Sequence, residues 1–155
     1  LSVILAILML LTGYFMMRSA YSNPAFSIGS NSHDASMMFP LTDLINFTLV
    51  FTLGLFHRTN GIAHKRLMLL AGILILDPAV ARLVEAIGAQ FVFIPIIELG
   101  LFAALLAYDR IKLKRLHWTS LLGLSLFFAA MVAKLMLASR PAWVDLAKLL
   151  FSSAS

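Results

Sequence analysis

Uncharged apolar blocks alternate with short polar segments along the whole chain. Positions 1–17 carry no charged side chain, positions 86–108 carry only Glu98, and positions 118–133 carry none. A helix needs about 20 mostly apolar residues to cross roughly 30 Å of hydrocarbon, and each block approaches that length. The pattern therefore predicts transmembrane helices rather than the core of a soluble domain.

We predict one transmembrane domain over residues 1–155, with the fold class of an all-α, integral membrane helical bundle. Its five helices are expected at about 1–17, 41–56, 65–88, 90–108 and 118–138. Pro78 removes one backbone hydrogen bond and predicts a kink in the third helix beside Asp77. Residues 141–151 predict a short amphipathic helix with Pro141 at its first position. This helix lies either in the plane of the membrane interface or packs as a terminal helix.

The composition agrees with a membrane protein. Hydrophobic residues make up 61% of the 155 positions and charged residues 12%, about half of the roughly 25% that a soluble domain carries. The net charge of +5 does not indicate nucleic-acid binding, because the basic residues gather in short turns between apolar blocks. The chain has no cysteine, which excludes disulfides and thiolate metal sites. Because it begins with leucine inside an apolar block, we expect a fragment or a processed product.

Two basic turns predict the orientation. They hold seven of the twelve Lys and Arg residues, so the positive-inside rule places them in the cytoplasm and the loop over residues 19–40 outside. The predicted partner of these turns is the lipid bilayer. We interpret their basic side chains as cytoplasmic anchors: Arg58, His64, Lys65, Arg66, Arg110, Lys112, Lys114 and Arg115.

Charged side chains within predicted transmembrane helices are the candidate ligand or ion cluster, because a charge in hydrocarbon costs several kcal/mol unless it is paired. With a rise of about 1.5 Å per residue, all of them fall in the outer half of the bilayer. We expect Arg82 to pair with Glu85 along one helix, and Glu98 to pair with Lys134 between helices. The cluster is either structural, fixing helix register, or a ligand or proton site. Its members are Asp43, Asp77, Arg82, Glu85, Glu98 and Lys134.

Other candidate chemistry is sparse. His57 and His117 share the level of the two basic turns, and two histidines on facing helices can ligate haem b; we expect no other cofactor and no metal site. The chain contains no HExxH, P-loop or GxGxxG motif. Whether it is an enzyme stays open, although the sequence favours a non-catalytic protein. Small residues let helices approach closely, and we expect this at Gly54, Gly72, Gly100 and Gly123.

One stretch of about 45 residues carries a resemblance. It contains Phe39-Pro-Leu-Thr-Asp-Leu, then His64-Lys-Arg-Leu-Met-Leu-Leu-Ala, then Ala81-Arg-Leu. It resembles an uncharacterised group of bacterial multi-pass inner-membrane proteins with a Pro-Leu-x-Asp segment opening one helix and an HKRLMLLA-type segment opening the next. The resemblance implies a further helix before Leu1 and carries over no activity. The group's pattern is matched here at Asp43, His64, Lys65, Arg66 and Arg82.

Three functions remain open from the sequence. The first is a non-catalytic accessory or structural subunit, packed against other membrane protein subunits of a larger complex. The second is a small transporter or proton-linked carrier that uses the outer charged cluster. The third is a b-type haem protein of the membrane.

Overall fold

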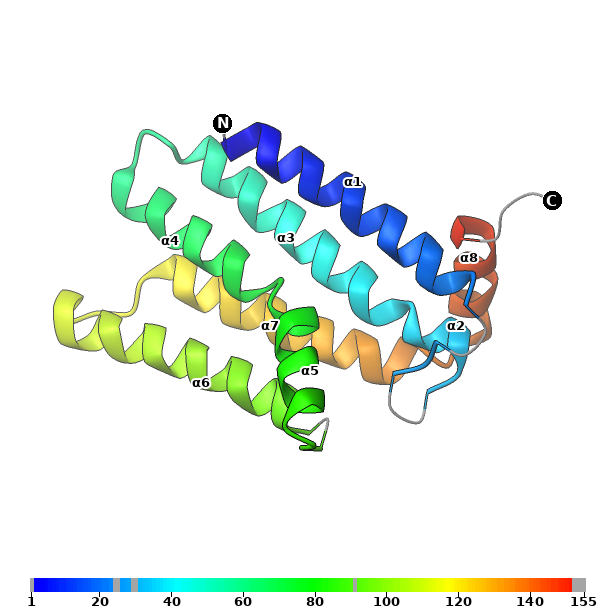
Figure 1. The fold of residues 1–155 in the computed structure, drawn as a ribbon. Coiled ribbons are helices and arrows are strands. Elements are labelled where there is room, and N and C mark those ends of the chain that lie inside the picture. Colours follow the sequence, from blue (N-terminus) through cyan, green and yellow to red (C-terminus); the bar gives the residue numbers. More distant parts are fainter. Residues whose placement is uncertain (1, 24–25, 29–30, 91, 152–155) are drawn as a thin grey trace. The chain divides into compact units, whose positions relative to one another are not determined.

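The computed structural model describes residues 2–23, 26–28, 31–90 and 92–151 (Figure 1). Every regular element in these ranges is helical, which confirms the all-α prediction for the described residues. The elements are α1 (Ser2–Tyr21), α2 (His33–Ser36), α3 (Met38–Phe56), α4 (Gly61–Ile73), α5 (Asp77–Ala86), α6 (Phe93–Tyr108), the π-helix η1 (Asp109–Leu113), α7 (Trp118–Leu137) and α8 (Pro141–Phe151).

Three helical segments are long and apolar enough to cross a membrane. They are Val3–Tyr21, His33–Phe56 and Trp118–Leu137, and the bent pair α4 and α5 makes a fourth if it counts as one span. Helix α6 has 16 residues, so it is only about 24 Å long. Apolar helices that can span a membrane are therefore present, and the predicted total of five spans stays a prediction.

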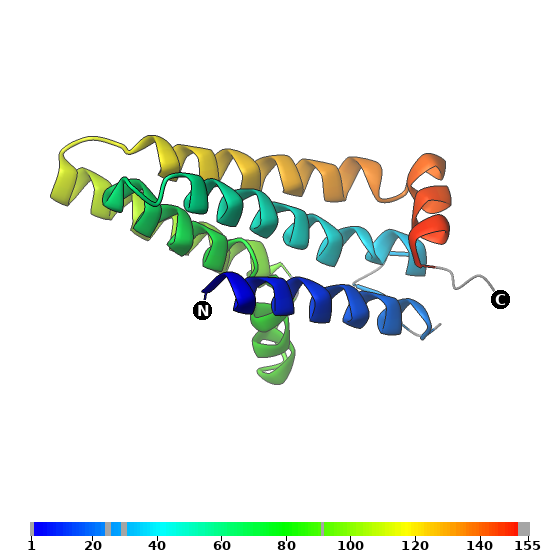
Figure 2. The ribbon, with the colours of Figure 1, turned by 90° about the horizontal axis from the view of Figure 1, so that it is seen from above.

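The predicted helix over residues 65–88 is two helices. It begins earlier than predicted, because the side chain of Asn60 accepts a hydrogen bond from the amide of Ala63 and caps α4 at Gly61. Pro78 lies in the first turn of α5, where backbone N–H groups have no partner within the helix, so the N–H that proline lacks costs no hydrogen bond. Figure 2 shows α5 leaving the direction of α4, and the two axes differ by 43°. The predicted kink is thus a complete break.

Gly88 ends α5 and separates it from α6. Its φ of +67° lies in the left-handed region, which costs glycine nothing. The amide of Gly88 donates to the carbonyl of Glu85, and the amide of Ala89 donates to that of Val84. These two bonds are the Schellman pattern, which satisfies the last carbonyls of a helix.

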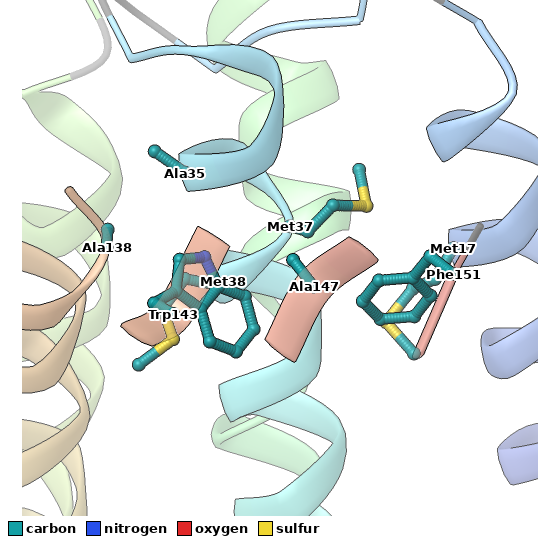
Figure 3. Packing of buried hydrophobic residues seen from close by; sticks show 8 residues of the cluster. All are labelled: Met17, Ala35, Met37, Met38, Ala138, Trp143, Ala147 and Phe151. Atoms are coloured by element: carbon teal, nitrogen blue, oxygen red, sulfur yellow. The ribbon is translucent and has the colours of Figure 1, made fainter. Parts of the chain in front are cut away.

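The chain forms two compact units, Leu1–Leu44 with Met131–Ser155 (unit 1) and Ile45–Ala130 (unit 2). In unit 1, α8 packs against α1 and α2. Its side chains Trp143, Ala147 and Phe151 are buried beside Met17 and Met37 (Figure 3). The indole Nε1 of Trp143 also donates to the carbonyl of Asp34 over 2.9 Å. The C-terminal helix therefore packs as a terminal helix, and its placement in a membrane interface stays a prediction.

In unit 2, α4 and α6 pack against the first part of α7. The rings of Phe102 and Phe127 lie 5.3 Å apart between α6 and α7, and Leu70 of α4 is fully buried. A Cβ on Gly123 would come within 2.4 Å of Leu70, and one on Gly54 within 2.1 Å of Met68. Close approach is thus confirmed at these two glycines. It is wrong for the other two, because the described residues leave nothing within 4 Å of a Cβ at Gly72 or Gly100.

Candidate functional site

A buried polar network joins three helical elements of unit 2. Arg66 projects from the second turn of α4, Asp109 is the first residue of η1, and Ser120 lies in the first turn of α7. Asp109 and Ser120 are fully buried, and Arg66 is 8% exposed. These residues are separated by 43 and 11 positions in the chain, so only the tertiary fold brings them together.

Both carboxylate oxygens of Asp109 accept hydrogen bonds. Nη1 of Arg66 forms a salt bridge with Oδ1 and also donates to the hydroxyl of Ser120 over 3.2 Å. The Ser120 hydroxyl in turn donates to Oδ2 over 2.7 Å, and the backbone amide of His117 donates to the same oxygen over 3.2 Å. The network therefore ties the end of α6 to the beginnings of α4 and α7.

The bonding of Asp109 stabilises its charged form. Burial by itself raises the pKa of a carboxyl group, but the hydrogen bonds from Ser120, Arg66 and the His117 amide outweigh this effect. The pKa of Asp109 is consequently lower than its ordinary value. Folding thus favours the ionised carboxylate that the salt bridge requires.

His117 caps α7 with its ring. Its Nδ1 accepts a hydrogen bond from the amide of Thr119 over 3.4 Å and lies 2.8 Å from the hydroxyl of the same residue. A nitrogen that accepts these bonds carries no proton, so the neutral ring with hydrogen on Nε2 fits the geometry. Burial and the nearby charge of Arg66 lower the pKa of His117, which agrees with a neutral ring.

The predicted cytoplasmic anchors fall into three groups by exposure. Six of them are exposed on the surface of unit 2, and His64 is half-buried with its Nδ1 donating to the carbonyl of Gly54 over 2.7 Å. Arg66 departs from the prediction, because its guanidinium is turned inward onto Asp109 rather than outward. The exposed members are Arg58, Lys65, Arg110, Lys112, Lys114 and Arg115.

The predicted charged cluster is divided between the two units. In unit 1, Lys134 forms an ion pair with Asp43 over 2.7 Å, and its ammonium lies 5.5 Å from the ring centroid of Phe39. The predicted pairing of Lys134 with Glu98, a buried residue of unit 2, stays a prediction. The pairing of Lys134 with Asp43 joins α3 to α7.

The other members of that cluster lie in unit 2. Asp77 begins α5 and is half-buried, whereas Glu98 is 5% exposed within α6. Arg82 and Glu85 are both exposed, and the described residues contain no ion pair between them, so their predicted intrahelical pairing is wrong. A cluster that joins all six charges across both units stays a prediction.

The two histidines considered for haem lie against one indole. The ring centroid of Trp118 is 5.4 Å from that of His57 and 6.0 Å from that of His117. The Nδ1 of His57 bonds the carbonyl of Leu53 over 2.9 Å. The indole of Trp118 therefore lies beside both imidazoles, and haem binding by His57 and His117 stays a prediction.

Sequence reasoning missed Asp109 and Ser120 as members of a site. Asp109 opens the second basic turn and received no role, although it is the sole acidic residue between positions 99 and 144 and is followed by four basic residues within six positions. A lone carboxylate among cations was the available signal. Ser120 gave no signal, because a serine near a helix start is ordinary.

Comparisons of the chain with protein-family models, curated proteins and solved structures found no match. The geometry defines an all-helical chain with apolar segments long enough to span a membrane and with buried charges that link its helices.

Proposed function

We propose that the chain is a multi-pass protein of a bacterial inner membrane. In this proposal it acts as a non-catalytic accessory or structural subunit of a larger membrane complex. Its basic turns face the cytoplasm, in keeping with the positive-inside rule. The resemblance to bacterial multi-pass proteins points in the same direction.

The observation that carries the proposal is the use of buried charge to join helices. Arg66 and Asp109 connect α4 to η1 and, through Ser120, to α7. Lys134 and Asp43 likewise connect α7 to α3. Charged groups that bond one another in this way specify helix register, which is the best-attested role of buried polar groups. These paired charges therefore support a structural role for the chain more than a catalytic one.

The apolar surface supports a place among lipids and other membrane subunits. Leu135 of α7 is 72% exposed, Ile96 of α6 is 54% exposed and Leu83 of α5 is 56% exposed. Large apolar patches on a folded chain mark a membrane or protein contact. Helix α6, at about 24 Å, is shorter than the roughly 30 Å hydrocarbon layer, and association with a neighbouring subunit is one way in which a membrane accommodates a short helix.

Site-specific photo-crosslinking in intact membranes tests the proposal. Benzoyl-phenylalanine is placed at Leu83, Ile96, Phe128 or Leu135, which are exposed, and at Phe102, which is 1% exposed on the same helix as Ile96. We expect a discrete crosslinked protein from at least one exposed position and none from Phe102. Native mass spectrometry should then show the same partner at fixed stoichiometry. Crosslinks to lipid alone, with a monomer or homodimer by mass, contradict the accessory role.

A proton-linked carrier is the second candidate, and the break between α4 and α5 favours it. Discontinuous helices form ion and substrate sites in many transporters. Here the break places Asp77 at the start of α5, and α6 carries the buried Glu98. In proteoliposomes with an internal pH dye, this candidate predicts proton uptake that Glu98→Gln abolishes and Asp145→Asn, an exposed control in α8, leaves unchanged. No uptake above that of empty liposomes rejects it.

A further inference from the structure

The two basic turns form one end of unit 2. The first connects α3 to α4 and the second connects η1 to α7. The ring of His57 from the first turn lies 5.4 Å from that of Trp118 after the second. Arg66, just after the first turn, is bonded to Asp109 at the start of the second. We call the surface made by residues 57–65 and 108–118 the basic end.

The charge of the basic end is of one sign. It carries six exposed basic side chains, and the one acidic residue in its two segments is Asp109. That carboxylate is fully buried and is bonded to Arg66, so it does not neutralise the surface. Six cations without an exposed carboxylate among these residues attract a partner that presents several negative charges.

Large apolar side chains are exposed among these cations. Ile111 of η1 is 73% exposed, Tyr108 is 54% exposed and Trp118 is 46% exposed. Tyrosine and tryptophan with an apolar body and a polar tip are typical of the membrane–water boundary. Lys and Arg can lay their apolar stems along such a surface while the charged groups reach outward. A polyanion in water would leave the exposed Ile111 uncovered, whereas a lipid leaflet covers both kinds of group.

The backbone that presents the cations is held in place. The end of η1 is fixed by Lys114, whose φ of 54° in the left-handed region stops the π-helix. The bonds of Asp109 to Arg66, Ser120 and the His117 amide anchor both ends of the turn. A surface that is ordered before binding loses less conformational entropy when a ligand binds.

We propose that the basic end is a binding surface for anionic phospholipid headgroups, selective for them over zwitterionic headgroups. This inference requires that the chain sits in a membrane, but it does not depend on the accessory role. An anionic phosphate would be contacted by side chains of both turns, so that one lipid links α3–α4 to η1–α7. The bound lipid therefore stabilises the fold of unit 2 and also fixes the depth of unit 2 in the leaflet.

Native mass spectrometry of the full chain in a mild detergent tests this inference. The protein is titrated with an equimolar mixture of phosphatidylglycerol and phosphatidylcholine. We expect phosphatidylglycerol to bind at least about tenfold more tightly, with the preference falling as salt rises. In the variant Arg110→Gln/Lys112→Gln/Arg115→Gln the preference should be lost. Each cation near an anionic surface accounts for about fivefold, so three of them give on the order of 100-fold.

The matched control removes the same number of exposed cations from unit 1, with Arg18→Gln/Arg140→Gln/Lys148→Gln. It should retain the preference of the native chain. Equal binding of the two lipids by the native chain, or an unchanged preference in the basic-end variant, overturns the proposal. If neither lipid is preferred but a polyglutamate peptide binds and the basic-end variant abolishes that binding, the surface docks acidic protein segments instead. Absence of a partner subunit in native membranes would count against the accessory role alone.

Discussion

Replacing Asp109 with asparagine keeps the shape of the side chain and removes its negative charge. Arg66 then becomes a cation that is 8% exposed and faces only neutral acceptors, the new amide oxygen and the Ser120 hydroxyl 3.2 Å away. The new amide also presents N–H donors where Ser120 and His117 now donate to a carboxylate. Removing one partner of a buried ion pair costs about 3–5 kcal/mol of unfolding free energy. This is a large part of the roughly 5–15 kcal/mol that stabilises a typical domain.

The assay is a double-mutant cycle in mixed micelles. Helix content and tryptophan fluorescence are followed while sodium dodecyl sulfate is titrated into the native chain, Asp109→Asn, Arg66→Met and the double variant. We expect each single variant to lose about 3–5 kcal/mol, because each leaves one buried charge uncompensated. The double variant should be more stable than the sum of the two losses predicts, since it removes both charges together. The coupling free energy is then at least about 2 kcal/mol.

An exposed neighbour provides the control. Arg110→Met removes a cation one position from Asp109 but on the surface, so its unfolding free energy should stay within about 0.5 kcal/mol of the native value. Losses from the two single variants that add to within about 0.5 kcal/mol would refute the reasoning. That result would mean that Arg66 and Asp109 do not act as a pair.

Three further predictions concern packing and pH. Gly123→Ala should destabilise the chain by about 1–3 kcal/mol in the same titration, because the new Cβ would lie 2.4 Å from the fully buried Leu70. Gly100→Ala places its Cβ in open space, so it should stabilise the chain by up to about 1 kcal/mol. Folding lowers the pKa of both His117 and Asp109, so each group contributes its full stabilisation only above its pKa in the unfolded chain. The free energy of unfolding should therefore fall below about pH 6.5 because of His117, and fall further below about pH 3.9 because of Asp109. His117→Asn, which can still cap α7, should remove the first of these losses, and equal stability of the native chain at pH 7.5 and 5.0 would contradict the assignment. Trp143→Phe removes the indole bond across the core of unit 1 and should cost about 1–3 kcal/mol by thermal unfolding, with no loss in Leu149→Ala, which is 79% exposed.

Local features of the fold could be read from the chain alone. The start of α8 at Pro141 follows from proline at a first helical position. The break before α5 follows from Pro78, although its extent was underestimated. Helix α5 ends at Ala86, within two residues of the predicted end at Gly88, since glycine accepts the left-handed backbone that follows the helix. Each feature depends on interactions within a few positions, and such interactions are visible in sequence.

The pairing of charged residues could not be read in this way. The depth estimate predicted Glu98 as the partner of Lys134, which stays a prediction, and it did not predict the bond of Lys134 to Asp43. Arg82 and Glu85 are three positions apart and yet both point to solvent. Depth along a helix follows from a fixed rise per residue, whereas the direction of a side chain around the helix depends on which neighbours pack there. Only the depth of each charged residue along its helix could be estimated from the sequence, whereas a pairing also requires the direction of its side chain around the helix.

The apolar blocks by themselves determined that the chain is helical and suited to lipid, because backbone groups in hydrocarbon must bond within their own segment. The distribution of basic residues likewise determined that the two turns are both positively charged. Only the tertiary structure decided that Asp109 is withdrawn from the basic surface to bond Arg66 and Ser120. Arg66 of α4 and Asp109 of η1 meet there although they are 43 positions apart, and no local pattern encodes that meeting.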